Sequence, residues 1–468
     1  MSLAKPIGRQ KEVLCLPAQG HFAVLGTAGS GKTTLAILRS AYLAEPTTDH
    51  HGKTLLVTFN RALVTYLRHL KDRRLDDVSI ENYHTFARGY LAVRNQMSRN
   101  HRNQILSDPD RREALIEQSV NRISRRYKSH PLLDHSIDLF SAELGWMAQH
   151  GITTYEAYKE VERVGRADAR IDRGHRELVF EIYQMYRSLR ESEGYKYDWD
   201  DISTAVCREF DNDNSPRLYR HIVIDEGQDF SPEMIRSLAK AIPPNGSLTF
   251  FGDVAQQIYG HRMSWRSAGL NIDKVWEFKE NYRNTKQIAK LGLAISQMPY
   301  FKGVPDLVEP ISPPADGPLP TVVKCSSMEE EIKFIILQAV RLARSQSVAI
   351  LFRDRQDEKL IKPHLPKESI RLHREMTTWQ AGPGIRYGTY HSAKGLEFDT
   401  VMLPFCNNKR LPHPEAVAAF GQKDATIQDG RLLYVGVTRA KIRLIVTYSG
   451  EITCLLPTDS ILYESLSR

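Results

Sequence analysis

A glycine-rich segment of the chain reads Gly26-Thr27-Ala28-Gly29-Ser30-Gly31-Lys32-Thr33-Thr34. Apolar residues precede it at 22–25 and follow it at 35–38. A buried strand, a glycine-rich turn and the start of a helix form the context that a phosphate-binding loop requires. Glycines let backbone N–H groups curl around phosphates without a Cβ clash. We therefore expect Lys32 to reach the β- and γ-phosphates and the Thr33 hydroxyl to hold Mg²⁺. The alternative is a glycine-rich turn that carries a lysine by chance.

The length and composition describe a globular protein of several domains. The chain has 468 residues, which suggests about three domains, and 41% hydrophobic with 26% charged residues is an ordinary globular balance. The formal net charge of +8 favours a polyanionic partner such as nucleic acid, although a modest surplus often serves solubility alone.

The cysteines give no sign of a metal site. The chain has five, at Cys15, Cys207, Cys325, Cys406 and Cys454, and they form no CxxC pair or Cys/His cluster. This scatter argues against structural zinc, an iron–sulfur cluster or a disulfide framework, and it favours reduced thiols in a cytoplasmic protein. The N-terminus has no long apolar run, so we expect no secretory signal, and no window is apolar enough to span a bilayer.

Gln10 lies upstream of the first expected strand. Its amide offers a donor and an acceptor together, so it can read an adenine edge. The alternative is an ordinary surface residue. The position of Gln10 ahead of the phosphate loop leaves these two interpretations equally weighted.

A second buried strand is expected at residues 55–57, and its end delivers Phe59, Asn60 and Arg61. Ligands gather beyond the carboxyl ends of parallel strands, and an aromatic ring beside polar and cationic groups suits contact with a single nucleic-acid strand. The alternative is core packing for Phe59 and helix capping for Asn60. His84 lies at a third such point, where a histidine alone is more often a structural hydrogen bonder.

Residues 88–196 lack strand-like apolar runs and show helical periodicity mixed with arginine. This pattern predicts a mainly helical inserted domain with basic faces. Such faces are often only solvated helix surfaces, but beside a nucleotide-binding core they are plausible contacts for a nucleic-acid backbone.

Two acids follow a short central strand that is expected at residues 222–224. This geometry fits Asp225 as a ligand of Mg²⁺ and Glu226 as the base that polarises a water molecule. An isolated Asp-Glu pair is usually an acidic surface turn, but the phosphate loop elsewhere in the chain makes that alternative weak.

Polar and aromatic residues follow another strand, which is expected from residue 247 onward. Gln256 is placed to sense the γ-phosphate or to orient the attacking water. Aromatic and cationic side chains then alternate, as a stacking surface needs, at Tyr259, His261, Arg262 and Trp265.

The second half of the chain alternates strands and helices but contains no second phosphate loop. Strands are expected at residues 348–352, 400–403 and 444–447. The arginines of this half, Arg283 and Arg439, can therefore serve the nucleotide that the first half binds.

The motifs read, in chain order, GTAGSGKTT, TFNRA, NYHTF, DWDD, IDEGQD, GDVAQQIY, ENYRNT, TYHSAKGLEF and YVGVTRAK. Together with Gln10 they resemble the set found in UvrD/Rep-type DNA helicases of superfamily one. The resemblance implies an α/β fold of tandem RecA-like P-loop domains, each a parallel sheet flanked by helices, with ATP in the cleft between them. It also implies that single-stranded DNA, or a duplex with a 3′ overhang, lies across their top and that translocation runs 3′ to 5′.

The same resemblance divides the chain. We expect residues 1–87 and 197–279 to form the first RecA-like domain, residues 88–196 a helical inserted domain, and residues 280–468 the second RecA-like domain. Residues 353–387 are too few to hold the family's second large insertion. Since that insertion regulates unwinding in relatives, the sequence leaves open whether the chain separates strands alone or needs an activating protein partner.

The resemblance also assigns roles to individual residues. The hydrolytic centre is Lys32, Thr33, Asp225 and Glu226, with Gln256 coupling the nucleotide to the strand and Arg283 and Arg439 as arginine fingers. The nucleotide base and sugar are contacted by Gln10 as adenine reader, Tyr282 as stacking aromatic and Glu397 near the sugar. The strand-contacting positions are Phe59, His84, Tyr259 and His391.

Two residues depart from the family pattern. His261 stands where relatives usually carry tryptophan or phenylalanine, so either the stacking is weakened or Trp265 substitutes. Thr34 stands where arginine is frequent.

Two alternative functions remain. One is an ATP-gated nucleic-acid sensing or binding subunit of a larger defence or repair complex. The other is a motor that follows RNA, because stacking and phosphate contacts do not by themselves choose the sugar.

Overall fold

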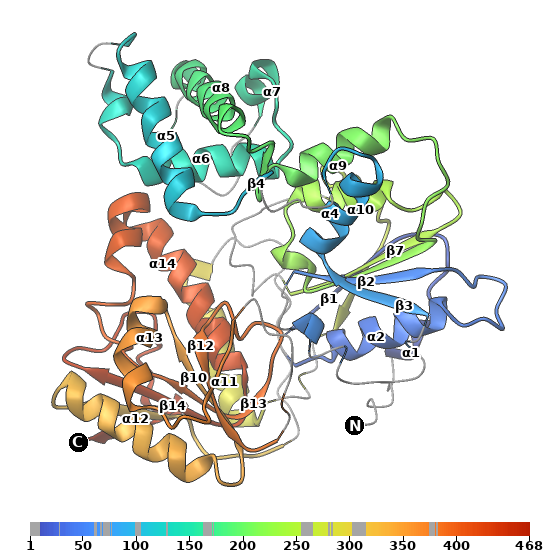
Figure 1. The fold of residues 1–468 in the computed structure, drawn as a ribbon. Coiled ribbons are helices and arrows are strands. Elements are labelled where there is room, and N and C mark those ends of the chain that lie inside the picture. The colour runs from blue at the N-terminus through green and yellow to red at the C-terminus, as the bar shows by residue number, and fades with distance from the viewer. Residues whose placement is uncertain are drawn as a thin grey trace.

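Two parallel β-sheets, each flanked by helices, and a separate cluster of helices make up the computed structural model (Figure 1). The residues described are 10–27, 29–59, 63–65, 68, 75, 77–98, 104–127, 130–161, 171, 173–253, 265–278, 281, 284–301, 315–373, 380 and 382–468. Among them, no helix is both long and apolar enough to cross a membrane.

The first sheet carries the phosphate-loop segment. Its strands are β1 (Gly20–Gly26), β2 (Thr54–Thr58), β3 (Val78–Asn82), β6 (His221–Asp225), β7 (Ser247–Gly252) and β8 (Val275–Phe278). They pair in the order β3-β2-β6-β7-β1-β8, and every pairing is parallel. All residues of β2, β6 and β7 are buried, which explains their near-continuous apolar sequences.

Helices cover both faces of this sheet. On one face lie α4 (Tyr83–Val93), α9 (Ile202–Asp211) and α10 (Pro232–Lys240), and on the other lie α1 (Gln10–Leu14) and α2 (Lys32–Leu43). Successive strand residues alternate between the two cores, so Ile222 and Ile224 face α9 and α10 while Val223 faces α2. Because all of its strand pairings are parallel, the carboxyl ends of the strands lie at the same end of the sheet.

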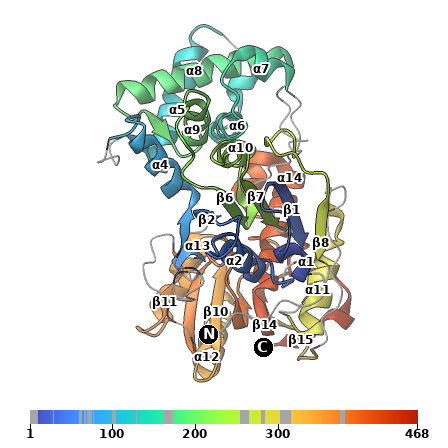
Figure 2. The same cartoon turned by 90° about the vertical axis from the view of Figure 1, so that its right-hand side faces the viewer.

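The helical cluster consists of α5 (Pro109–Ser124), α6 (Ile137–Gln149), α7 (Tyr155–Glu160) and α8 (Arg176–Ser192). It has its own core. The chain enters and leaves it through the short strands β4 (Ile105–Leu106) and β5 (Tyr197–Asp198), which pair with each other. The boundary expected at residue 88 falls inside α4, whose buried residues Tyr83, Phe86 and Leu91 pack on the first sheet. Figure 2 shows the cluster standing above both sheets.

The second sheet contains β9 (Thr321–Cys325), β10 (Ser347–Phe352), β11 (Ile370–Arg371), β12 (Gly384–Thr389), β13 (Phe398–Leu403), β14 (Ala440–Ser449) and β15 (Glu464–Ser467). They pair in parallel in the order β11-β12-β10-β13-β14-β9-β15. One face is covered by α11 (Lys286–Ser296) and α14 (Pro414–Thr438), the other by α12 (Met328–Leu342) and α13 (Arg355–Ile361). Two parallel sheets between helix layers confirm the predicted α/β class.

Short 3₁₀ helices occupy several connections. They are η3 (Pro131–Asp134), η4 (Arg173–His175), η5 (Gly227–Asp229), η7 (Pro299–Phe301), η8 (Lys362–His364) and η9 (Ser460–Leu462). The last residue of β6 is followed within two positions by η5, which turns the chain sharply where the two acids stand.

The short connection after β10 is tied to the body of the second half. Arg353 Nε donates to Asp429 Oδ1 of α14 at 2.5 Å, and His413 Nε2 lies 2.7 Å from Asp354 Oδ2. These contacts hold the start of α13 against the middle of α14 and against His413, the residue before it.

Candidate nucleotide and nucleic-acid site

The phosphate loop connects β1 directly to α2. Gly29 and Gly31 adopt φ of 81° and 84°, a left-handed conformation that favours glycine. Gly26 is constrained by space instead, because a Cβ there would lie 2.5 Å from Ser30 Oγ. The glycines that the sequence analysis singled out are therefore required by the shape of the loop.

The Lys32 ammonium lies inside this loop. Its Nζ donates to the backbone oxygens of Gly26 and Thr27, each at 2.7 Å, and it lies 3.8 Å from Asp253 Oδ2. The side chain is only 9% exposed, so a buried cation sits beside the loop's backbone. Such a cation is suited to an anionic ligand with several oxygens.

Gln10 lies against the same loop. Its Nε2 donates to the backbone oxygen of Ser30 at 3.2 Å and would be 3.3 Å from a Cβ at Gly31. The side chain therefore reaches the loop from α1, beside the place where a bound nucleotide would extend away from its phosphates.

Asp225 ends β6 beside the start of α2. Burial and the neighbouring Glu226 raise the pKa of Asp225 to about 7, against a hydrogen bond from Thr33 and the charge of Lys32. Its Oδ2 has no hydrogen-bond partner among the described residues. A buried carboxylate oxygen without a partner, next to a threonine hydroxyl, is a donor set that fits a hard divalent cation.

The Gln228 side chain holds the Glu226 carboxylate in place. The φ of Glu226 is 54°, uncommon for a residue other than glycine. Gln228 Nε2 donates to Glu226 Oε2 at 2.5 Å, and Gln228 Oε1 accepts from the backbone N–H of Asp253 at 2.8 Å. Gln228 therefore links the strand end of β6 to that of β7 and orients the glutamate carboxylate.

Residues of the second half approach Glu226 closely enough to change its protonation. Burial alone would raise its pKa, but Lys394, Arg439 and Lys32, in that order, hold it below the usual value. Lys394 forms an ion pair with Asp229, and their side chains are 4% and 2% exposed. One buried centre thus receives groups from both halves.

Arg439 is fixed in place by the second half. Its guanidinium is 1% exposed and donates to the backbone oxygens of Val435 at 3.0 Å and Leu396 at 3.4 Å. Arg439 is the residue between α14, which ends at Thr438, and β14, which begins at Ala440. The structure brings this predicted residue into the field of Glu226.

Aromatic rings gather at the ends of β2 and β3. The ring centroids of Phe59 and His84 are 5.7 Å apart, and those of His84 and Trp199 are 4.7 Å apart. Arg88 lies over the Trp199 ring at 5.9 Å from its centroid. Phe59 and Trp199 are only partly buried, so this group presents ring surface beside a cation.

For several other predicted residues, the structure gives burial or core packing. Trp265 packs edge-on against Phe250, with centroids 5.0 Å apart, as part of the first sheet's core. His391 and Thr34 are half-buried, and Glu397 is exposed. The predicted residues that lie outside the described part of the chain are Ala28, Asn60, Arg61, Gln256, Tyr259, His261, Arg262, Tyr282 and Arg283.

Gln228, Lys394 and Trp199 are among the residues of this site that were not singled out from the sequence. Each lies inside a motif that was quoted, so the signal was adjacency to a recognised pattern. Their contacts could not be read from the sequence, because Lys394 and Asp229 are 165 residues apart in the chain.

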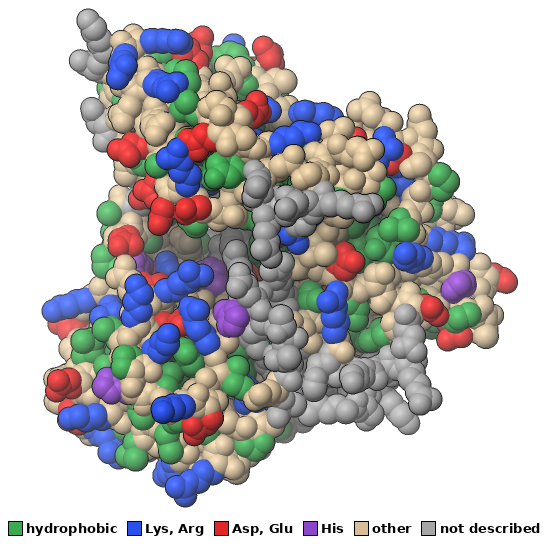
Figure 3. Space-filling model, in the orientation of Figure 1, with side chains coloured by type: hydrophobic (Ala, Val, Ile, Leu, Met, Phe, Trp, Pro, Cys, Tyr) green, Lys and Arg blue, Asp and Glu red, His purple; other side chains and the backbone are tan. Residues whose placement is uncertain are grey.

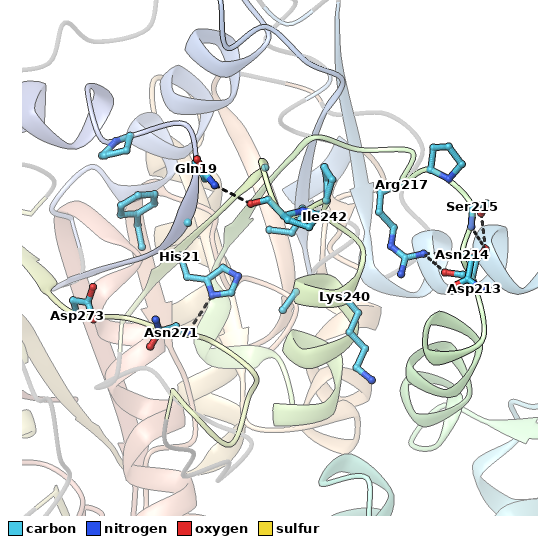
Figure 4. Close-up of a pocket in the computed structure, with 18 residues that line it drawn as sticks. Gln19, His21, Asp213, Asn214, Ser215, Arg217, Lys240, Ile242, Asn271 and Asp273 are labelled. Atoms are coloured by element: carbon cyan, nitrogen blue, oxygen red, sulfur yellow. Dashed lines mark hydrogen bonds and ion pairs between the residues drawn. The ribbon is translucent and has the colours of Figure 1, made fainter.

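A cavity of about 910 Å³ lies elsewhere, at the amino ends of β1 and β7 (Figure 4). His21, Arg217 and Lys240 are among its lining residues. The phosphate loop follows the carboxyl end of β1, whereas this cavity lies at the amino ends of the strands. The cavity is therefore separate from the site above.

Surface charge does not by itself mark a nucleic-acid path. On the face shown in Figure 3, Lys and Arg side chains are spread over the helical cluster and over both halves rather than gathered in one patch. The aromatic group at Phe59, His84 and Trp199 is a more specific candidate for strand contact than the net charge.

A parallel sheet with a phosphate loop before α2 and two acids after β6 defines a P-loop nucleoside triphosphatase. Family comparison narrows this class. The description "UvrD/REP helicase N-terminal domain" matches residues 8–277, and "UvrD-like helicase C-terminal domain" matches residues 372–451. The chain therefore belongs to the UvrD/Rep helicase family and, with it, to the ATP-hydrolysing DNA helicases.

Individual relatives of this chain are also named as DNA helicases. The ATP-dependent DNA helicase UvrD2 of Mycobacterium tuberculosis is 21% identical over 562 aligned positions, covering 94% of this chain and 78% of the relative. DNA helicase II of Haemophilus influenzae is 23% identical, covering 60% of this chain and 38% of the relative. The first alignment is longer than this chain's 468 residues, so UvrD2 carries residues that this chain lacks.

Proposed function

We propose that this chain is a motor that moves 3′ to 5′ along single-stranded DNA and hydrolyses ATP between its two halves. The observation that supports this most is the buried centre where Lys394 of the second half pairs with Asp229 of the first, and where Lys394 and Arg439 lower the pKa of Glu226. The proposal includes the division into a first domain of residues 1–87 and 197–279, an inserted domain of 88–196, and a second domain of 280–468, with the rest of α4 (Tyr83–Val93) assigned to the first domain on which it packs.

The residues present fit ATP and Mg²⁺. Lys32 and the loop amides would hold the phosphates, and Thr33 with Asp225 would hold the cation, which would neutralise charge on the transferring phosphoryl group. Asp225 supplies the buried carboxylate oxygen that otherwise lacks a partner among the described residues.

Glu226 is proposed as the base that orients and deprotonates the attacking water. Its lowered pKa keeps it ionised at neutral pH, as a proton acceptor must be, and Gln228 fixes its carboxylate. Arg439 would add positive charge from the second half at the moment when negative charge develops. Hydrolysis would then depend on how the two halves meet.

The strand is proposed to pass over the carboxyl ends of β2 and β3. There, Phe59, His84 and Trp199 offer ring faces to successive bases, and Arg88 adds a cation near the backbone. Asp229 lies in η5, directly after the two acids, and pairs with Lys394 in the motif that also contains His391. This ion pair would connect the nucleotide site to the strand if His391 contacts it.

One observation favours the sensing-subunit alternative. The connection after β10 is short, and the Arg353–Asp429 and Asp354–His413 contacts hold its first residues beside α14. A chain without the regulatory insertion could use ATP to gate binding instead of stepping.

ATP hydrolysis with matched single-stranded DNA and RNA of one sequence tests the proposal. We expect DNA to stimulate hydrolysis strongly and the Glu226→Gln variant to bind ATP without turning it over. Stimulation by RNA alone would support the RNA-directed motor. Absence of stimulation by either polymer, or turnover that survives in Glu226→Gln, would contradict the proposed function.

A further inference from the structure

Arg39 of α2 is a fully buried cation whose partners are backbone carbonyls. Its side chain is 0% exposed, and its guanidinium donates to the oxygens of Leu14 and Leu16, each at 2.7 Å, and of Pro17 at 2.6 Å. It also lies over the Tyr42 ring, 5.5 Å from the centroid. Among the described residues, no carboxylate forms an ion pair with it.

This arrangement is expensive for a purely structural role. Burial lowers the pKa of Arg39 to about 10, which shows that the surroundings disfavour its charge. Apolar residues of similar volume often replace buried charges without loss of stability. A guanidinium in this position does one thing that an apolar side chain cannot, which is to hold three carbonyls at once.

The three carbonyls belong to the end of α1 and the turn that follows it. From the apolar side, α1 is anchored by Val13, which is 0% exposed and packs with Leu35 and Ala36 of α2. At its other end, Gln10 reaches the backbone oxygen of Ser30 in the phosphate loop. The position of Gln10 therefore depends on how α1 is fixed against α2.

We propose that Arg39 is a positioning residue for base recognition, fixing α1 so that the Gln10 amide faces the base of a nucleotide bound at the phosphate loop. The inference rests on the proposed function, because the nucleotide is the ligand of that loop. A fixed amide presents one donor and one acceptor, which matches the N7 acceptor and the N6 donor of adenine. Guanine presents two acceptors on that edge and is matched less well.

The test compares the full-length wild type with Arg39→Met, using equilibrium binding of fluorescently labelled ATP and GTP. In Arg39→Met the two hydrogen bonds between the Gln10 amide and adenine should be lost, so ATP binding should weaken about tenfold. Each hydrogen bond contributes roughly 0.7 kcal/mol, and a tenfold change in affinity corresponds to about 1.4 kcal/mol. GTP binding should change less than about twofold, so the preference for ATP should fall. DNA-stimulated turnover at saturating ATP should stay within about twofold of wild type.

A double-variant cycle separates positioning from general damage. Gln10→Ala should lower the ATP preference to the same extent, and Gln10→Ala with Arg39→Met should be no worse than either alone. Val13→Ala loosens α1 from the apolar side, so it should reproduce the loss even if Arg39→Met fails to fold. Ser40→Ala, which removes a buried hydroxyl that donates to the Ala36 oxygen within α2, should leave the preference unchanged.

Three outcomes would overturn the inference. The first is additive losses in the double variant, and the second is an equal weakening of ATP and GTP binding. The third is an unchanged preference for ATP in Gln10→Ala. That result would show that Gln10 does not read the base, but it would not bear on the proposal that DNA stimulates hydrolysis. Failure of the proposed function is distinguishable, because it would appear as absent DNA-stimulated turnover in a wild type that still binds ATP.

Discussion

Lys394 of the second half and Asp229 of the first form an ion pair that is almost completely buried, with side chains 4% and 2% exposed. Lys394 is also the largest of the charges that lower the pKa of Glu226. Burial raises the pKa of Asp229 to about 6, although Lys394 opposes this shift. The pair therefore joins the two halves at the carboxylates of the first half.

Lys394→Met should destabilise the chain and stop DNA-stimulated turnover. Removing one partner leaves Asp229 buried without its cation, which typically costs about 3–5 kcal/mol. In Lys394→Met with Asp229→Asn, the stability should largely recover, because no buried charge is left alone. Turnover should stay low, since Glu226 still lacks the lysine. Chemical denaturation and ATPase assays measure the two effects separately.

The partly exposed pair between Lys441 and Asp399, at 3.1 Å and with side chains 38% and 27% exposed, is the control. Lys441→Met should change the free energy of unfolding by less than about 1 kcal/mol, because solvent screens a surface pair. Equal, small losses in Lys394→Met and Lys441→Met would show that the buried pair does not join the halves.

Gln228→Ala should lower kcat without changing the KM for ATP. The amide orients Glu226 through one hydrogen bond and accepts the backbone N–H of Asp253 in another, so neither bond is made to the phosphate loop itself. The Asp253 side chain, which Gln228 does not contact through these bonds, is the group that lies 3.8 Å from Lys32. Poor orientation of a base should cost on the order of 10²-fold in rate. Steady-state kinetics with saturating DNA provide the measurement. A KM effect with kcat intact would assign Gln228 to nucleotide binding instead.

Trp199→Ala should weaken binding of single-stranded DNA. Loss of one stacking surface costs about 1–3 kcal/mol per base, so the dissociation constant should rise about tenfold or more. Trp276 is the control, since it lies on β8 at the opposite edge of the first sheet, with Lys274 4.0 Å from its ring centroid. Fluorescence anisotropy with a labelled oligonucleotide should show no loss for Trp276→Phe. Similar losses for both variants would count against the aromatic group as the strand site.

A buried network ties the helical cluster to the segment that carries Trp199. Arg190 NH1 lies 2.7 Å from Asp201 Oδ2 and 3.2 Å from Asp198 Oδ2, and Arg112 NH2 donates to Asp200 Oδ2 at 3.0 Å. Three carboxylates therefore share two guanidinium groups. Burial and the neighbouring Asp198 raise the pKa of Asp201 to about 7.

This shift predicts a pH dependence of stability. An acid whose pKa is higher in the folded state stabilises the fold fully below its unfolded pKa, near 3.9, and loses that contribution as pH rises to about 7. Relative to Asp201→Asn, the wild type should lose up to about 1.4 kcal/mol per pH unit in this window. Urea denaturation of both proteins from pH 4 to 8 measures the difference. Parallel curves would contradict the prediction.

The parallel sheets were predictable because their central strands are buried on both faces. Residues 222–224 and 348–352 are continuous apolar runs, and such runs indicate parallel strands. Strand β15 could not be predicted in this way, because all of its residues are exposed and it exists through pairing with β9. Strand β12 (Gly384–Thr389) has glycine at positions 384 and 388 and an arginine between its two apolar residues, so its apolar pattern is weak.

Individual site residues were predictable where a local motif carries the chemistry. The phosphate loop and the pair Asp225 and Glu226 each combine a strand end with the required side chains. The roles of Lys394 and Arg39 could not be predicted, because each depends on a partner that only the fold brings near. Lysine and arginine in a helix or a loop are otherwise typical of solvated surface.

The most direct test of the central claim is the time at which the protein reaches the end of single-stranded DNA of increasing length. A dye at the 5′ end reports arrival under single-turnover conditions with saturating ATP. If hydrolysis between the halves drives stepping, arrival time should increase in proportion to strand length, and Glu226→Gln should give no arrival signal. Arrival times that do not depend on length would contradict the account and favour an ATP-gated binding protein.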